Sequence, residues 1–259
     1  MKVVNQFSTT LGRRALLRLL KFLGNRKGYY LFGSNAVSSN GYSFEHQILN
    51  KNESWFENFE ERWMYSVDSV RYATLELLRR EIYENALEGA VAEVGVYKGV
   101  FASVINYYFP NKQLYLFDTF EGFDSRDVQV DNQMGYSPAS TDDFNDSNIE
   151  LVLSRMFHRD KIVVKKGWFP ESAGGCENEK FCFVSLDTDL YQPIYSGLCW
   201  FYPRLVNGGY IMVNDYNIDN YQGTKKAVHE FTKENGISYT PICDLGGSAV
   251  IGKPLKMGK

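Results

Sequence analysis

The sequence is poor in cysteine and contains no long apolar run. Its 259 residues include four cysteines with no C-x-x-C pair, namely Cys176, Cys182, Cys199 and Cys243. Cys182 and Cys199 lie in apolar segments and are predicted to be small core residues. Because no apolar run is long enough to span a bilayer and no cleavable signal stands at the start, we expect a soluble, cytoplasmic protein with reduced thiols.

Acidic residues are missing from the first 30 positions. Residues 1–30 carry seven basic side chains, so the formal net charge of −3 leaves about −10 for the rest of the chain. Within residues 11–27, basic side chains occupy one helical face and leucines another. This pattern predicts an amphipathic helix that either lies peripherally on an anionic membrane surface or docks on the protein body or a second subunit. We favour docking, because an apolar stripe is usual for a helix that packs on a neighbour.

Beyond residue 65, strand-like runs alternate with helix-like runs. The alternation predicts an α/β fold with a doubly wound, mostly parallel, seven-stranded sheet. The last two strand-like runs lie too close together for a helical crossover, so we expect an antiparallel C-terminal hairpin. A helix over 66–86 with Ser66 as N-cap precedes the sheet. The predicted strands are 90–96, 113–118, 161–165, 181–187, 209–214, 238–243 and 248–252, and the predicted helices between them are 98–108, 148–157, 191–203 and 222–234.

The common phosphate-binding glycine motifs are absent as well. The first strand leads into Gly95-x-x-x-Gly99 rather than G-x-G-x-x-G, and there is no G-K-[ST] loop. Glu93 would repel a pyrophosphate, which argues against an NAD-dependent oxidoreductase. A carboxylate beside a close-packed glycine turn suits a cationic ligand without phosphate, such as S-adenosylmethionine. Asp118, at the end of the next strand, is placed to accept hydrogen bonds from a ribose diol; the alternative is that both acids only cap helices.

Oxygen ligands follow the fourth and fifth strands. Asp187 ends the fourth strand, and Asn214 and Asp215 end the fifth. Adjacent parallel strands would bring these side chains to one rim, and an all-oxygen set favours Mg²⁺ over zinc. Asp189 is the next candidate ligand, although it could equally cap the following helix. Alternatively, all of these side chains face solvent and only cap the turns between strands and helices.

Five blocks of the sequence resemble the macrocin O-methyltransferase family, over about residues 65 to 235. They are AVAEVGVYKGV, LYLFDTFEGF, VVKKGWFPES, FVSLDTDLYQPIYSGLCWFYPRLVNGGYIMVNDY and GTKKAVHEF. The basic side chains and the polar loop after them predict a basic helical extension and loop over 1–55, ahead of a domain over 56–259. The resemblance implies a Rossmann-like class I methyltransferase fold for that domain. It also implies a homo-oligomer with a subunit contact through the N-terminal helices.

The resemblance further implies metal-assisted methyl transfer from S-adenosylmethionine to a hydroxyl of a sugar or glycoside, with no nucleic-acid partner. It places the metal ligands at Asp187, Asn214 and Asp215, where the family usually has Asp at position 214. The amide leaves the site with one negative charge fewer. The alternative is a non-catalytic or metal-independent binding protein on the same fold. The predicted donor-binding residues are Glu93, Gly95, Tyr97, Gly99, Asp118, Thr119, Phe120, Ser140, Gly167 and Trp168.

The proton acceptor is harder to assign. A histidine in the acceptor-side loop is the suspected base of the family, but this chain has no histidine between His46 and His158. Asp187, or Asp143 in the loop 122–146, is therefore predicted to accept the hydroxyl proton. That loop is long, polar and irregular, which is typical of a functional lid. By resemblance, Ser140 in it contacts the adenosine, while Gly167 and Trp168 close the adenine pocket.

Overall fold

The computed structural model describes residues 68–255. The predicted extension over 1–55, its amphipathic helix over 11–27 and the domain boundary at 55/56 lie outside the described residues. Within the described part of the chain, no helix combines the length and apolar character needed to cross a membrane.

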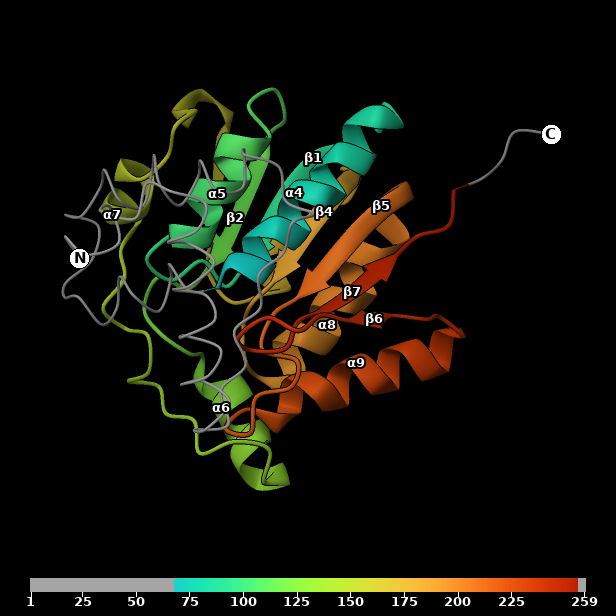
Figure 1. Ribbon diagram of the computed structural model, residues 1–259. Coiled ribbons are helices and arrows are strands. Elements are labelled where there is room, and N and C mark those ends of the chain that lie inside the picture. Colours follow the sequence, from blue (N-terminus) through green and yellow to red (C-terminus); the bar gives the residue numbers. More distant parts are fainter. Residues whose placement is uncertain (1–67, 256–259) are drawn as a thin grey trace, which may run out of the picture. The chain divides into compact units, whose positions relative to one another are not determined.

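Between residues 68 and 255, the core of the fold is a single sheet of seven strands. Their order is β3-β2-β1-β4-β5-β7-β6. The first five are parallel, whereas β7 pairs antiparallel with both β5 and β6, which confirms the predicted topology and its C-terminal hairpin (Figure 1). The strands are β1 (Ala90–Val94), β2 (Leu114–Asp118), β3 (Ile162–Lys166), β4 (Phe181–Leu186), β5 (Leu205–Val213), β6 (Thr240–Pro241) and β7 (Ala249–Gly252).

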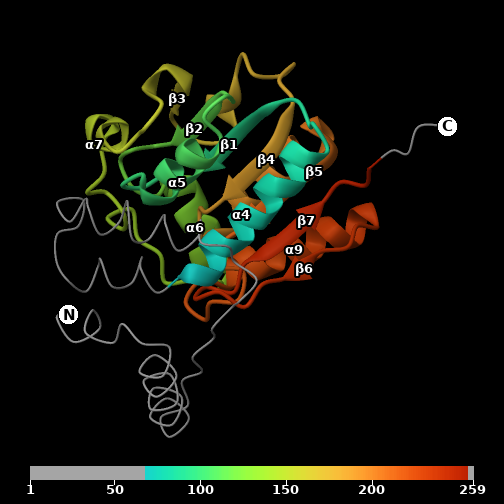
Figure 2. The ribbon, with the colours of Figure 1, turned by 45° about the horizontal axis from the view of Figure 1, so that its top comes forward.

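Helices cover both faces of the sheet, because the parallel strands are apolar on both sides. Neighbouring residues of one strand point to opposite faces: Val91 packs with α4 and α5, and Ala92 packs with α8 and α9. Figures 1 and 2 show α4 and α5 on the same side of the sheet. The helices are α4 (Ser69–Glu84), α5 (Val100–Tyr108), α6 (Ser125–Met134), α7 (Ile149–Ser154), α8 (Tyr191–Phe201) and α9 (Gln222–Asn235).

Three local predictions are wrong. The N-cap of α4 is Asp68 rather than Ser66, since its side chain accepts a hydrogen bond from the Arg71 amide at 3.4 Å. Strand β5 begins at Leu205, four residues before the predicted start. Cys199 is exposed on α8 rather than buried, because the apolar face of that helix is formed by its neighbours Leu198 and Phe201.

The region 122–146 is not a continuous irregular loop. It contains helix α6, which begins after Asp124 and ends at Gly135. The Asp124 side chain accepts from the Arg126 amide, and Gly135 takes a left-handed conformation with φ of 67°, so both ends carry ordinary helix caps. The helix was missed because its sequence, SRDVQVDNQM, has little apolar periodicity.

Candidate active site

The register of the central strands brings the predicted site residues to one level. The Gly95 amide donates to the Phe117 carbonyl at 2.9 Å, the Asp187 amide to the Val94 carbonyl at 2.8 Å, and the Asn214 amide to the Leu186 carbonyl at 2.9 Å. These bonds extend the ladders one residue beyond β1, β4 and β5. The site therefore lies at the carboxyl ends of the strands, beside the switch in strand order between β1 and β4.

The glycine turn after β1 is held against β4 and β2. A Cβ on Gly95 would lie 2.0 Å from the Asp187 carbonyl oxygen, and the φ of Gly95 is +82°, so only glycine fits there. The Asp118 carboxylate braces the turn by accepting hydrogen bonds from the amides of Val96 (2.6 Å) and Tyr97 (2.9 Å). Burial raises the pKa of Asp118, while these amide hydrogen bonds lower it.

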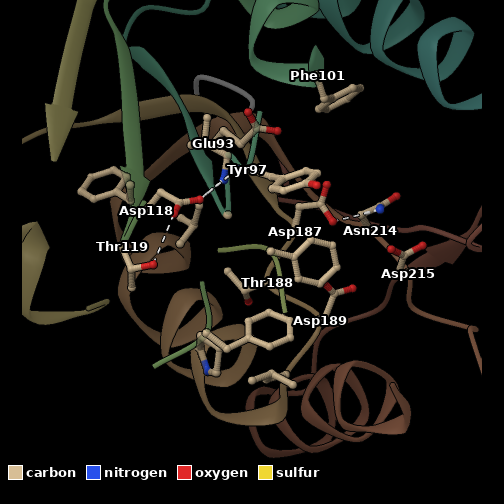
Figure 3. Close-up of a pocket in the computed structure, with 18 of the residues that line it drawn as sticks. Glu93, Tyr97, Phe101, Asp118, Thr119, Asp187, Thr188, Asp189, Asn214 and Asp215 are labelled. Atoms are coloured by element: carbon tan, nitrogen blue, oxygen red, sulfur yellow. Dashed lines mark hydrogen bonds between the residues drawn. The ribbon is translucent and has the colours of Figure 1, made fainter. Parts of the chain in front are cut away.

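A pocket of about 680 Å³ opens at this level. Figure 3 shows Asp118 and Thr119 at one end of it and Asp215 at the other, with Glu93 between. Of the described residues that line the pocket, nine are acidic and two, Arg71 and Lys98, are basic. The predicted residues on its lining are Glu93, Gly95, Tyr97, Asp118, Thr119, Gly167, Trp168, Asp187, Asn214 and Asp215.

Four predicted site residues do not line the pocket. Gly99 is the N-cap of α5, and a Cβ there would meet Val152. Phe120 is buried, and its amide donates to Asp118 at 2.6 Å. Gly99 and Phe120 therefore support the turns that carry the site without lining the pocket. Ser140 and Asp143 bond to each other instead, through the Ser140 amide and Asp143 Oδ2 at 2.9 Å.

The segment around Ser140 and Asp143 reaches the pocket through Phe144, a residue absent from the predicted set. The Phe144 ring lies edge-on to Tyr97 and to Phe123, each at 5.1 Å between centroids. Phe123 in turn contacts Tyr221 at 6.1 Å. All four rings belong to residues that line the pocket and provide it with an apolar wall. No motif marked the wall, because its contacts join segments far apart in the chain.

Trp168, the residue predicted to border the adenine, lines the pocket and has an unexpected partner. Trp168 Nε1 donates to Asp127 Oδ2 at 2.9 Å, and the Arg126 guanidinium lies 3.8 Å from the centre of the Trp168 ring system. Burial raises the pKa of Asp127 to about 7. Asp127 belongs to α6, so this contact escaped prediction together with the helix.

An acidic cluster forms at the other end. Carboxylate oxygens of Asp187, Asp189 and Asp215 lie within 4.8 Å of one another (Figure 3). Burial, and then the charges of Asp187 and Asp215, raise the pKa of Asp189 well above its usual value. Burial and then Asp187 raise the pKa of Asp215 to about 6. Three mutually repelling carboxylates suit a hard dication with oxygen ligands, so this donor set fits Mg²⁺.

Asn214 adjoins this cluster in a different way from that predicted. Its Nδ2 donates to Asp187 Oδ1 at 2.9 Å (Figure 3), and its Oδ1 accepts from Ser248 Oγ at 3.2 Å. The amide oxygen, the atom expected to coordinate a metal, is therefore turned toward Ser248. Asp189 provides the third carboxylate instead.

Arg71 is a further lining residue that no sequence pattern marked. This side chain reaches the pocket from α4 with only 8% of its surface exposed. Its Nη2 lies 2.8 Å from Asp187 Oδ2, and its guanidinium lies 3.7 Å from the centre of the Phe101 ring. The second basic lining residue, Lys98, pairs with Asp146 at 2.7 Å.

The strand order and the acidic pocket at the switch point define a class I methyltransferase fold. Residues 61–252 match the Macrocin-O-methyltransferase (TylF) family, and the chain belongs to that family. The resemblance drawn from the sequence blocks is thus confirmed.

Two curated relatives are sugar O-methyltransferases by name. The chain is 33% identical over 91 residues to the 8-demethyl-8-(2,3-dimethoxy-alpha-L-rhamnosyl)-tetracenomycin-C 4'-O-methyltransferase of Streptomyces olivaceus, covering 35% of this chain and 33% of the relative. It is 27% identical over 169 residues to the Mycinamicin III 3''-O-methyltransferase of Micromonospora griseorubida, covering 60% of this chain and 64% of the relative. The chain thus spans less than two thirds of each relative.

Solved structures share the fold. The O-methyltransferase NovP aligns with a TM-score of 0.60 at 17% identity, over 73% of this chain and 81% of NovP. The calicheamicin methyltransferase CalS11 aligns with a TM-score of 0.56 at 16% identity, over 86% of this chain and 95% of CalS11. At these identities the alignments support the predicted fold and carry no residue assignments.

Proposed function

We propose that this protein transfers a methyl group from S-adenosylmethionine to a hydroxyl of a sugar or glycoside, with assistance from a divalent cation. The observation that carries the proposal is the excess of acids in a pocket at the switch point, in a chain of an O-methyltransferase family. S-adenosylmethionine bears a sulfonium and an ammonium and no phosphate, so its charge complements that pocket. The printed names of the two curated relatives support a sugar or glycoside acceptor.

The donor would lie across the turn after β1. Glu93 is 1% exposed, and its Oε2 has no hydrogen-bond partner among the described residues, which leaves it free to accept from the ammonium. Asp118 would accept from the ribose, and Trp168 with Gly167 would border the adenine. These residues hold the methyl group in one orientation, and such alignment accounts for much of the rate in a displacement reaction.

The acceptor hydroxyl would enter beside the acidic cluster, with the aromatic wall excluding water. Asp187, Asp189 and Asp215 would hold the dication, while Asn214 orients Asp187 by donating to it. When bound, the cation would supply Lewis acidity that makes the hydroxyl easier to deprotonate. Asp187 remains the proposed proton acceptor, whereas Asp143 is not among the residues that line the pocket.

The test is a methylation assay over nucleotide sugars and glycosides, with product detection by mass spectrometry in Mg²⁺ and in excess EDTA. We expect a mass gain of one methyl group with at least one sugar and a large loss in EDTA. Glu93→Gln should weaken donor binding by about tenfold or more in calorimetry, and Glu150→Gln, at an exposed site on α7, should not. Donor binding without methylation of any sugar would favour the non-catalytic alternative, and full activity in EDTA would favour the metal-independent one.

Assembly and location also belong to the proposal. We propose that the protein is a homo-oligomer whose subunits contact one another through the N-terminal region. We also propose a cytoplasmic location, with peripheral membrane contact through residues 11–27 as the alternative. Sedimentation of the full chain and of a variant lacking residues 1–27 tests the first point. Partitioning of both onto anionic vesicles tests the second, and equal partitioning would remove the membrane alternative.

A further inference from the structure

Asp187 carries two internal partners, one on each oxygen. Oδ1 accepts from Asn214 Nδ2 at 2.9 Å, and Oδ2 faces Arg71 Nη2 at 2.8 Å. Asp187 is also one of the three carboxylates that would hold a dication. A cation bound at this cluster needs an oxygen of Asp187, and the guanidinium already occupies one of the two.

We propose that Arg71 is the resident counter-ion of Asp187 and that a divalent cation binds by displacing it. The inference rests on the metal site of the proposed function. It makes Arg71 a positioning residue that lowers the affinity of the cluster for metal. The charge of Arg71 substitutes for part of the cation's charge while the cluster is metal-free.

The surroundings of Arg71 are suited to such an exchange. Its Nε has no hydrogen-bond partner among residues 68–255, and the pair with Asp187 is the ionic contact that holds the guanidinium in the cluster. The face-on contact with Phe101 does not depend on Asp187, so the guanidinium keeps one support after displacement. The charges of Glu93 and Asp68 also act on Arg71, so the guanidinium keeps attractive neighbours after displacement.

The buried position makes the competition strong. Arg71 is 8% exposed and the Asp187 side chain is 21% exposed, so solvent screens this pair only in part. Adding a dication next to a guanidinium that stays on Asp187 would place like charges in contact. Removing the guanidinium should therefore favour metal binding, even though it leaves the metal-free cluster less stable.

The experiment is a calorimetric titration of Mn²⁺ into the full chain and three variants. Arg71→Gln removes the charge and should bind Mn²⁺ about tenfold more tightly or better. Arg71→Lys keeps a charge on a shorter group without the planar fork, and should bind a few-fold more tightly. Arg79→Gln is the matched control, because Arg79 lies on the same helix and donates to the Tyr108 carbonyl away from the pocket; its affinity should equal that of the wild type.

A second measurement does not depend on the folding of a neutral variant. The NMR signal of the Arg71 side-chain N–H in the wild-type protein is assigned by its absence from the spectrum of Arg71→Lys. Titration with diamagnetic Mg²⁺ should shift this signal in step with the occupancy of the metal site. Equal or weaker Mn²⁺ binding by Arg71→Gln, or an Arg71 signal that ignores Mg²⁺, overturns the inference and leaves the metal site standing. Failure of every protein to bind metal overturns both, and a separate titration with S-adenosylmethionine then tells whether the donor site survives.

Discussion

At the scale of single residues, Asn214 distinguishes this chain from the pattern of the family it resembles. An Asp at that position would face Asp187 with a second carboxylate, whereas the amide donates a hydrogen bond to it. The amide therefore stabilises the metal-free cluster and removes one negative charge from it. An Asp at this position should raise the affinity of the cluster for metal and lower the stability of the metal-free protein, whereas Asn does the reverse.

Asn214→Asp tests that opposition. Without metal, the lost hydrogen bond and the new repulsion should lower the free energy of unfolding by about 1–3 kcal/mol. Saturating Mg²⁺ should recover most of the loss. Thermal unfolding in EDTA and in Mg²⁺ measures both effects, with the exposed Asn111→Asp as control. Unchanged stability in EDTA would contradict the role given to the amide.

Asp127 gives a pH-dependent prediction. Its pKa is raised from 3.8 to about 7 by burial, so the native state holds this proton more tightly than the unfolded chain does. The free energy of unfolding should therefore fall as the pH rises from about 4 to about 7, and the cost persists above pH 7. Asp127→Asn keeps an acceptor for Trp168 Nε1 and should raise stability at pH 8 by about 1–3 kcal/mol, with little effect at pH 4.

Chemical unfolding of Asp127→Asn at several pH values measures this dependence. The exposed Asp142→Asn serves as control and should leave the pH profile of stability unchanged. A gain for Asp127→Asn that is equal at pH 4 and pH 8 would rule out titration of Asp127 as its cause.

The residues found from the sequence are those at the carboxyl ends of strands or just beyond them. Glu93, Asp118 and Asp187 were predictable because parallel strands end at one edge, whatever the details of packing. Arg71 and Phe144 were not, since each reaches the pocket from an element whose own sequence carries no functional signal. The exchange of Asp189 for Asn214 in the cluster depended on side-chain direction, which strand position does not determine.

At the scale of elements, the turn after β1 is the part least able to change. Gly95 combines a positive φ with a backbone oxygen of Asp187 that a Cβ would overlap. Gly135, the C-cap of α6, has a similar φ of 67°, and nothing lies within 4 Å of the position that a Cβ would take there. The two glycines therefore separate the cost of backbone strain from the cost of a clash.

Gly95→Ala should lower the free energy of unfolding by about 3 kcal/mol or more and abolish donor binding, because the turn must move away from β4. Gly135→Ala should cost only about 1 kcal/mol, since strain alone opposes it. Chemical denaturation and calorimetry with S-adenosylmethionine measure both quantities. Comparable losses in the two variants would show that the contact with Asp187 does not restrict the turn.

Helix α6 shows where prediction of elements failed. Its caps, Asp124 and Gly135, are visible in the sequence, but its interior lacks the apolar spacing on which helix prediction chiefly depends. All seven strands were found, although not all of their ends, because their apolar runs are continuous. A prediction weighted toward capping residues would have found α6, and with it the contact between Asp127 and Trp168.

At the scale of the whole molecule, the alternation of strands and helices was enough to predict the sheet and its antiparallel edge. Periodicity does not determine the order of the strands, which the structure gives. The pocket is a property of the assembled fold, because its acids come from the ends of β1, β2, β4 and β5, from α6 and its N-cap, and from the segments that precede α4 and α7. Their combined field should act on any charged ligand.

That field predicts how donor binding responds to salt. S-adenosylmethionine carries a sulfonium charge that its product, S-adenosylhomocysteine, lacks, while both share the adenosine and the amino-acid part. Attraction of the sulfonium to the acidic pocket is screened by added ions. Raising KCl from 0.02 M to 0.5 M, which shortens the Debye length about fivefold, should therefore weaken binding of the methyl donor more than binding of the product. We expect the ratio of the two dissociation constants, measured by calorimetry in EDTA, to change a few-fold over that range. If both ligands weaken in parallel, the pocket distinguishes them by shape, and its excess of carboxylates acts chiefly on the metal.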